Sequence, residues 1–251
     1  MGMATEAPLF SLITVTRNAK RQFETLRDDV RRIETRNHEW VIVDGASTDG
    51  TVEVIRSSSD VVTRWLSEQD SGIYDAMNKG LNLASGQYVV FFGADDRLYP
   101  QALGQMEVWL KAQPVLPDFV VAAVDVGASA RRGYRPQRAW LGHRACVTCH
   151  SVGMLVKREI MIGIGGFSLE YPLCADGLVI KRLIQGRYAG LESEIVMGRF
   201  GLKGVTNTNV ARCLAECYLI QLATGENPWL QRLLYGARLV KNAPRLLRAR
   251  E

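Results

Sequence analysis

Four apolar, strand-like stretches in the first hundred residues each end in a polar turn, and the first three are followed by a helical pattern. The strand-like stretches are Phe10–Val15, the run "WVIVD" that ends at Asp44, Val61–Leu66 and Tyr88–Phe92. The helical patterns cover Arg21–Thr35, a segment that begins near Thr51, and Ile73–Leu83. This alternation predicts an α/β fold with a Rossmann-like, mostly parallel mixed sheet flanked by helices.

Polar side chains follow the carboxyl end of each of these strands. They are Thr16, Asn18, Asp44, Asp70, Asp95 and Asp96. Open α/β sheets bind their ligands at this edge. A single acid after a strand usually caps the next helix, but polar groups after four successive strands favour one shared binding crevice.

The two adjacent carboxylates after the fourth strand indicate what the crevice binds. Because a buried, unpaired charge is costly, Asp95 and Asp96 predict a cationic partner. Oxygen ligands suit Mg²⁺ or Mn²⁺, which bridge to phosphate oxygens. The first two turns contain neither G-x-G-x-x-G nor G-K-[ST], which argues against a dinucleotide or P-loop site. A metal-bound nucleoside diphosphate fits better, and Asp44 could accept a hydrogen bond from a base N–H.

Several of these stretches also resemble a known family. The segments "SLITVTRNA", "WVIVDGASTDGT", "SEQDSGIYDAMNKGLNLASGQYVVFFGADD" and "GGFSLEYPLCADGLVIKRL" are similar to family-two glycosyltransferases of the GT-A fold. They look closest to the bacterial exopolysaccharide and colanic-acid type. The resemblance covers roughly residues 8 to 210, and "DSGIYDAMNKG" is its most specific part.

The resemblance implies roles for particular residues. Asp44 would contact the nucleobase, and Asp95 and Asp96 would contact the ribose, the diphosphate and a Mn²⁺ or Mg²⁺ ion. Asp176 matches the catalytic base of a late acidic motif. Lys203, in "GRFGLKGVTNTN", is a candidate phosphate contact.

The same resemblance implies an activity. The chain would be a metal-dependent glycosyltransferase of the hexosyltransferase class that inverts the anomeric carbon. Its donor would be a nucleotide-sugar, with uridine diphosphate as the expected nucleotide. The acceptor would be a glycan or a polyprenyl-linked saccharide in polysaccharide or cell-envelope biosynthesis.

The chemistry of Asp176 can also be argued from the reaction. Inverting transfer is a single displacement in which one positioned base removes the proton of the acceptor hydroxyl. Asp176 opens a helical pattern that continues through Leu178, Val179 and Leu183. The alternative role for such a residue is a helix N-cap.

The chain departs from the family pattern at several positions. Arg17 stands where many relatives have an aromatic residue, and Gly93 stands where many have a side-chain ligand. Gly45 replaces the second acid of "DDGS", and "CHSVG" replaces the commoner "HQ" run while keeping His150. These changes predict a weakly held metal and a single acid at the base and ribose.

The excess positive charge of the chain lies in its last 24 residues. The net charge is +5, and Pro228–Glu251 contains six basic residues and one acid. A helix there would place Trp229, Leu230, Leu233, Leu234, Ala237 and Val240 on one face and Gln231, Arg232, Tyr235 and Arg238 on the other. Such a basic amphipathic tail either lies on a membrane surface or packs its apolar face on the domain.

Length and composition predict one folded domain with this tail attached. At 251 residues and 47% hydrophobic content, residues 1–227 can share one core. Residues of about 8–100 would form the nucleotide-binding half, those of about 115–210 the acceptor half, and 228–251 the tail. No stretch has the ~20 apolar residues of a membrane span, and the N-terminus does not resemble a signal peptide. We therefore expect a cytoplasmic protein. A peripheral location at the inner face of the plasma membrane is the second expectation.

The cysteines predict reduced thiols, because five at irregular spacings do not suggest a disulfide framework. Cys146, Cys149 and His150 resemble half of a zinc site, but a structural role is the commoner one and the group stays unassigned. Cys213 and Cys217, four residues apart, fit one packed helix face.

Two other classes of function remain open. A nucleotidyltransferase normally needs a glycine-rich basic loop after its first strand, and "TVTRNAKRQ" contains no glycine. A noncatalytic nucleotide- or carbohydrate-binding module would keep the crevice without a base. Nucleic acid is not an expected partner, because the chain has no basic patch interleaved with aromatic residues.

Overall fold

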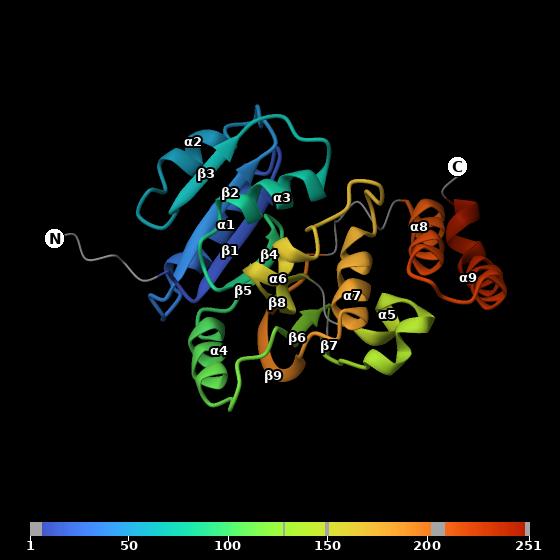
Figure 1. Ribbon diagram of the computed structural model, residues 1–251. Helices are drawn as coiled ribbons and strands as arrows, with labels where there is room; N and C mark the ends of the chain where they lie inside the picture. Colours follow the sequence, from blue (N-terminus) through green and yellow to red (C-terminus); the bar gives the residue numbers. More distant parts are fainter. Residues whose placement is uncertain (1–6, 128, 149–150, 202–208, 249–251) are drawn as a thin grey trace.

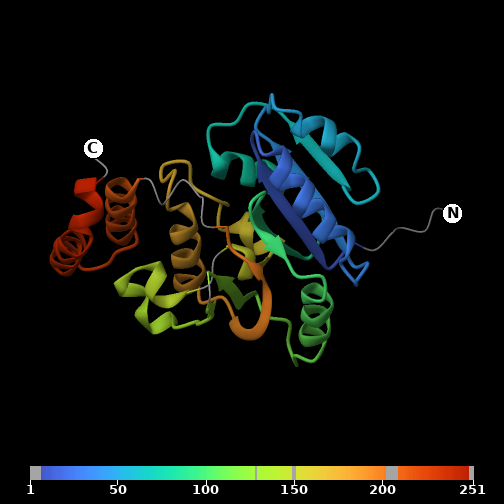
Figure 2. The same cartoon turned by 180° about the vertical axis from the view of Figure 1, so that it is seen from behind.

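The computed structural model describes residues 7–127, 129–148, 151–201 and 209–248. One mixed sheet runs through the molecule, helices cover it, and the two C-terminal helices stand apart from the sheet (Figures 1 and 2). Within the described residues the strand order is β3-β2-β1-β4-β8-β6-β9-β5, with β7 paired to β6. The predicted α/β fold is confirmed.

The N-terminal half of the sheet is parallel. It consists of β1 (Phe10–Thr16), β2 (His38–Asp44), β3 (Arg64–Ser67) and β4 (Tyr88–Gly93). Thr16 pairs with Asp44, and Val15 pairs with Gly93, so these strands end level with one another. β3 begins later than predicted, because the N–H groups of Val61 and Val62 bond to the Ser58 carbonyl in a turn.

Helices cover both faces of this half. The first helices are α1 (Lys20–Arg31), α2 (Thr51–Arg56) and α3 (Ile73–Leu83). Phe23 of α1 stacks on Trp40, with ring centroids 5.3 Å apart. Leu12 joins the core on the α1 face and Ile13 the core on the α3 face, as alternation along a doubly covered strand requires. α1 is shorter than predicted, because Ile33 bonds back to the Val30 carbonyl in a tight turn.

The second half extends the sheet with strands of mixed direction. Its strands are β5 (Arg97–Leu98), β6 (Phe119–Val126), β7 (Ser129–Arg131), β8 (Met154–Lys157) and β9 (Gly190–Arg199). Its helices are α4 (Ala102–Lys111), η1 (Pro136–Leu141), α5 (His143–Cys146), η2 (Ser151–Gly153), α6 (Arg158–Gly163) and α7 (Ala175–Gln185). β8 is antiparallel to both β4 and β6, and Arg97 of β5 pairs with Arg199 of β9. This last pairing brings the segment after β9 back to the end of β4.

Two helices follow the sheet, α8 (Val210–Ala223) and α9 (Pro228–Arg248). The buried Lys181 of α7 forms an ion pair with Glu226, which follows α8. Gln221 donates to the carbonyls of Ala139 and Trp140, at 3.1 and 2.8 Å. Polar contacts thus fix α8 against α7 and η1. Among the described residues, no helix is long and apolar enough to cross a membrane.

The orientation of α9 decides between the two roles considered for the tail. Gln231 is fully buried and its amide donates to the Trp140 carbonyl at 2.8 Å, while Arg238 donates to the Leu141 carbonyl. Trp229, Leu233 and Val240 are 72%, 74% and 77% exposed. The structure shows the amphipathic helix, and of the two alternatives left open it disfavours packing of the apolar face on the domain. The polar face packs instead, because it supplies donors to carbonyls at the end of η1.

Candidate active site

The turns after β1 and β2 are joined by polar side chains. The Asn18 side-chain oxygen accepts the N–H of Thr48 at 2.8 Å, and the Asn18 N–H donates to the Ser47 hydroxyl at 2.7 Å. Asp44 accepts the N–H of Ser47 at 2.9 Å and also its hydroxyl. Asn18 and Asp44 therefore lie in one network at the carboxyl edge of the sheet, as predicted.

Asp44 is enclosed more completely than the sequence indicated. It is fully buried, and Ser67 at the end of β3 donates a further hydrogen bond to it at 2.7 Å. Both of its carboxylate oxygens thus have serine partners. Sequence reasoning missed Ser47 and Ser67. The tendency of an Asp side chain to bond to nearby backbone in a turn was the available signal for Ser47, whereas Ser67 lies 23 residues away and had no local signal.

Asp70 approaches this network through Gly45. A Cβ atom at position 45 would overlap with the Asp70 carboxylate and lie 3.3 Å from Cδ of Arg17. The space next to Asp44 is therefore occupied by the carboxylate of Asp70, which also accepts the Gly72 N–H at 3.0 Å. An acid from the turn after β3 thus lies beside Gly45, the position at which the family pattern has its second acid.

Thr16 contributes a buried hydroxyl to the same edge. It is buried, it pairs with Asp44 in the sheet, and its carbonyl accepts the Gly45 N–H at 2.9 Å. Among the described residues its hydroxyl oxygen has no hydrogen-bond partner. Buried polar atoms are normally satisfied, so this hydroxyl is available to a ligand.

Asp96 is held by backbone amides at the end of β4. Its side chain accepts the N–H of Gly93 and the N–H of Gly201, each at 2.8 Å, and the residue is 3% exposed. Burial raises its pKa to about 7; the two backbone bonds oppose the rise, and the charge of Asp95 adds to it. The predicted cation is therefore not the sole compensation for this carboxylate, because two amides already contribute.

Asp95 lies beside Asp96 but is exposed. A Cβ atom at Gly201 would overlap with the Asp95 carboxylate, and one at Gly93 would lie 3.0 Å from it. Only a residue without a side chain fits at 201, a position that sequence reasoning missed. Lys203, Cys149 and His150 lie outside the described residues.

Asp176 is the second residue of α7, and the N-cap of this helix is Cys174, so Asp176 does not have the alternative role of an N-cap. The residue is exposed. Its carboxylate accepts the Tyr74 hydroxyl at 3.2 Å and the Gly177 N–H at 2.8 Å. Tyr74 is the second residue of α3, and α3 begins three residues after Asp70. Tyr74 thus brings Asp176 to the edge where the other acids lie.

Tyr74 is a further residue that the sequence analysis missed. It stacks on Phe167, with ring centroids 5.2 Å apart. Burial, followed by the charge of Asp176, raises the pKa of the Tyr74 phenol well above its ordinary value. The phenol therefore stays protonated at neutral pH and donates to Asp176. Its position within "DSGIYDAMNKG" was the available signal.

Comparison with known proteins identifies the class. Residues 11–169 match the sequence profile of glycosyl transferase family 2, and the chain belongs to this family. Asp176, α8 and α9 lie beyond the matched residues.

Individual relatives agree with this assignment. A PGL/p-HBAD biosynthesis glycosyltransferase of Mycobacterium bovis is 38% identical over 96 residues, a match that covers 37% of this chain and 38% of that protein. The chain thus aligns with well under half of that relative's length.

Solved structures confirm the GT-A-like fold. S. aureus TarS 1-349 in complex with UDP-GlcNAc superposes with a TM-score of 0.66 at 14% identity, covering 93% of this chain and 72% of that one. The mannosyltransferase PcManGT from Pyrobaculum calidifontis, in complex with GDP-Man and Mn²⁺, has a TM-score of 0.63 at 20% identity and covers 96% and 76%. The colanic-acid type suggested by the sequence stays a prediction.

Proposed function

We propose that the chain is an inverting, metal-dependent glycosyltransferase that takes a sugar from a nucleoside diphosphate donor, with UDP as the first candidate. The acceptor would be a saccharide, free or polyprenyl-linked, in cell-envelope or polysaccharide biosynthesis. Family membership supports the reaction class. One observation carries the proposal: Asp96, held by the amides of Gly93 and Gly201, lies at the sheet edge that also carries Thr16, Asp44 and Asp70.

The donor would bind across the ends of β1, β2 and β4. Thr16 offers a buried hydroxyl without a partner among the described residues, and Asn18 and Asp44 hold the two loops that would enclose the base. Asp70 and Arg17 flank Gly45, so an acceptor and a planar cation are available to a nucleoside. Lys203 remains a proposed phosphate contact.

The acid pair fits a hard divalent cation. Asp95 is exposed, and each oxygen of Asp96 keeps a lone pair after accepting one amide N–H. Carboxylate oxygens of this kind suit Mn²⁺ or Mg²⁺. When bound, the ion would stabilise negative charge on the departing diphosphate.

Asp176 would act as the base. Tyr74 donates to one carboxylate oxygen at 3.2 Å, which fixes the carboxylate and leaves its other oxygen for the proton of the acceptor hydroxyl. The exposed position of Asp176 at the start of α7 allows an acceptor to reach it. A single base is sufficient for inversion.

The complexes named in two structural neighbours, UDP-GlcNAc for TarS and GDP-Man with Mn²⁺ for PcManGT, guide the experiment. The thermal stability of the purified chain would be measured with UDP- and GDP-sugars, with and without Mn²⁺. Binding to the folded state raises stability by mass action, so one nucleotide class should raise the Tm only when metal is present. A turnover assay then separates a transferase from a binding module or a nucleotidyltransferase, because only the transferase moves the sugar to an acceptor and releases the nucleoside diphosphate.

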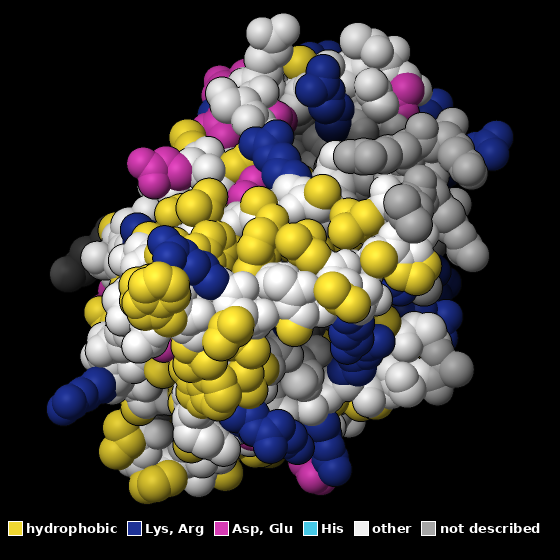
Figure 3. Space-filling model, turned by 90° about the vertical axis from the view of Figure 1, so that its right-hand side faces the viewer, with side chains coloured by type: hydrophobic (Ala, Val, Ile, Leu, Met, Phe, Trp, Pro, Cys, Tyr) yellow, Lys and Arg dark blue, Asp and Glu magenta, His cyan; other side chains and the backbone are white. Residues whose placement is uncertain are grey.

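We further propose that residues 1–227 form the catalytic domain and that α9 attaches it to an anionic membrane surface, such as the cytoplasmic leaflet. Figure 3 shows apolar side chains next to Lys and Arg side chains on the face that carries the C-terminal helices. Trp229 and Leu233 are largely exposed, and Arg232 lies over the Trp229 ring at 4.9 Å. Basic residues near an anionic surface contribute about 1 kcal/mol each.

Co-sedimentation of the full chain with vesicles containing phosphatidylserine tests the role of α9. Leu233→Glu should reduce the bound fraction severalfold. Val108→Glu is the matched control, because Val108 is 70% exposed on α4. Equal loss in both variants, or no binding by the unaltered chain, would remove the membrane role without affecting the proposed chemistry.

A further inference from the structure

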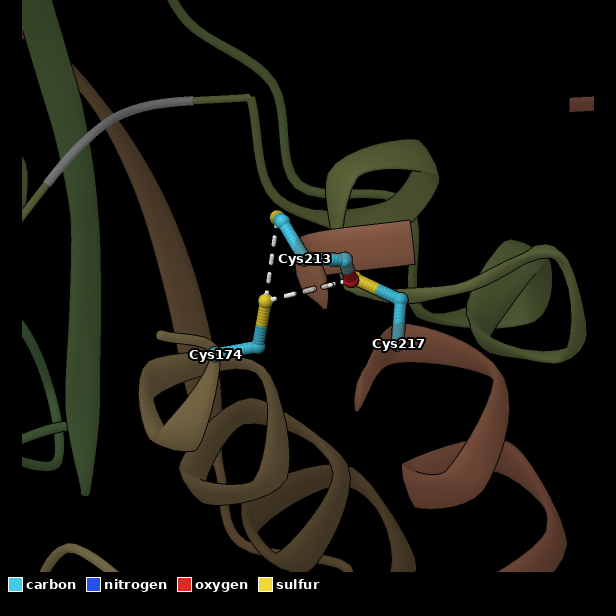
Figure 4. Close-up of side chains that lie close together, drawn as sticks. All are labelled: Cys174, Cys213 and Cys217. Atoms are coloured by element: carbon cyan, nitrogen blue, oxygen red, sulfur yellow. Dashed lines mark hydrogen bonds between the residues drawn. The ribbon is translucent and has the colours of Figure 1, made fainter. Parts of the chain in front are cut away.

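Three thiols meet where α8 packs against the start of α7. Cys174 is the N-cap of α7, and Cys213 and Cys217 are one turn apart on α8. The Sγ atom of Cys174 lies 3.1 Å from that of Cys213 and 3.5 Å from that of Cys217, and all three lie within 4.8 Å of one another. Figure 4 shows the three side chains pointing to one place.

The position of Cys174 does not depend on the sulfur contacts alone. Glu216 of α8 is buried and accepts the N–H groups of Leu173 and Cys174, at 2.8 and 3.1 Å. Arg212 donates to the other oxygen of Glu216 at 3.0 Å. The segment that carries the first thiol is therefore attached to the helix that carries the other two, and the cluster is preorganised.

The spacing of the sulfurs matches a tetrahedral metal site. With Zn–S bonds of about 2.3 Å, tetrahedral ligands lie about 3.8 Å from one another. The two separations from Cys174, 3.1 and 3.5 Å, are somewhat shorter than that value, and all three sulfurs lie within 4.8 Å of one another, so modest side-chain movements would fit the ion. A disulfide would use two of the thiols and would leave the convergence of the third unexplained.

A cationic side chain lies beside the cluster. Nη2 of Arg144 lies 3.6 Å from the Cys213 sulfur, a cation that apolar packing of thiols would not require. Cys217 is only partly buried, so an ion and a completing water ligand could enter on its side.

We propose that Cys174, Cys213 and Cys217 bind one Zn²⁺ ion. The three thiols release their protons to solvent as the ion binds, and Arg144 offsets the net negative charge of the resulting centre. The ion ties α8 to the first turn of α7, two residues before Asp176. This site is separate from the carboxylate site of the proposed function and is formed by sulfur instead of oxygen.

Co²⁺ titration of the reduced full-length chain tests the site, because cobalt bound to thiolates gives a charge-transfer band that carboxylates do not give. We expect the intensity of this band to saturate at one Co²⁺ per chain and to disappear when Zn²⁺ displaces the cobalt. Cys174→Ser, Cys213→Ser and Cys217→Ser should each weaken binding by more than the ~10–100-fold that loss of an outer-shell partner costs. Cys146→Ser, at a buried free cysteine outside the cluster, and Asp96→Asn should keep the band.

Protection of thiols gives a second readout that does not depend on the variants folding. In the unaltered chain, one equivalent of Zn²⁺ should protect three of the five cysteines from alkylation, and mass spectrometry should identify them as this cluster. A reduced, folded chain that shows neither the band nor the protection would overturn the proposal. A Cys174–Cys213 disulfide that forms with diamide in a chain unable to bind Co²⁺ would assign the cluster to redox chemistry instead.

Discussion

The parallel half of the sheet and helix α9 use their side chains in opposite ways. In β1 and β2 the apolar residues are buried, and the polar residues at the strand ends gather at one edge of the sheet. In α9 the buried side chain is Gln231, while Trp229, Leu233 and Val240 face outward. Apolar burial stabilises the first region, whereas hydrogen bonds to the Trp140 and Leu141 carbonyls of η1 attach the second.

This difference separates the tasks of the two regions. A sheet that buries its apolar residues can hold acids at a fixed edge, because the strands that precede these acids end level with one another. A helix that docks through its polar face leaves an apolar surface for another partner. The first region therefore fits donor binding and the second fits attachment. Substitutions in the first region should therefore impair donor binding or turnover, and those in the second should impair attachment.

The largest effect is expected for the base. Asp176→Asn should reduce turnover by about 10²–10⁴-fold, the range for loss of a general base, while binding of UDP with Mn²⁺ is retained. Glu170→Gln, an exposed acid in the loop before α7, is the matched control and should keep its activity. Turnover of Asp176→Asn within twofold of the unaltered chain would remove the assigned role.

The buried acid Asp96 should make stability depend on pH. Its pKa is raised to about 7 when folded, so the folded state favours the protonated form. The contribution of Asp96 to the free energy of unfolding without metal is thus largest below pH 4 and is lost as the pH rises toward 7. The free energy of unfolding of Asp96→Asn should therefore rise relative to that of the unaltered chain, by up to about 4 kcal/mol over that interval.

Urea unfolding from pH 4 to 8 measures this difference. Asp95→Asn, at the exposed neighbour, should follow the unaltered chain. Parallel profiles for Asp96→Asn and the unaltered chain would show that Asp96 does not carry the raised pKa. With Mn²⁺ and UDP the order should reverse, because the ion requires the carboxylate.

Truncation of leucine to alanine should cost more unfolding free energy in β1 than in α9. Leu12→Ala, at a fully buried site in β1, should cost about 3 kcal/mol of unfolding free energy. Leu233→Ala in α9, at a site 74% exposed, should cost less than about 0.5 kcal/mol. Urea unfolding of both variants compares them. A large loss for Leu233→Ala would mean that the apolar face of α9 packs on the domain after all.

Removal of a buried polar side chain from α9 should cost more unfolding free energy than removal of its exposed apolar ones. Gln231→Ala removes the donor to the Trp140 carbonyl and should destabilise the chain by about 1 kcal/mol. Arg232→Ala, at an exposed neighbour in the same turn, serves as its control. If hydrogen exchange in α9 is equally fast with and without Gln231, the polar contacts do not attach the helix.

The sequence predicted the parallel half well because its information is local. Apolar periodicity placed α3 at its observed bounds and β1, β2 and β4 within a few residues of theirs. It also placed the polar residues at one edge, because parallel strands end together. Four of these, Thr16, Asn18, Asp44 and Asp70, lie in contact or in register as expected.

Other parts of the site depend on contacts between distant residues. The Gly201 amide reaches Asp96 from 105 residues away, and Tyr74 reaches Asp176 from 102. The Cys174 and Cys213 sulfurs meet across 39 residues. Periodicity carries no signal for such pairs. The orientation of α9 was open for the same reason, since it is decided by the carbonyls of Trp140 and Leu141.

The central claim is that polar residues at the ends of β1 and β2 and acids at the end of β4 hold a metal-bound nucleoside diphosphate. A crystal structure of the chain with UDP and Mn²⁺ tests it most directly, with the ion located by its anomalous scattering. We predict Mn²⁺ bonded to a carboxylate oxygen of Asp95 or Asp96 and the uracil between the turns that carry Asn18 and Asp44. A well-ordered nucleotide and ion distant from all four residues would contradict the account.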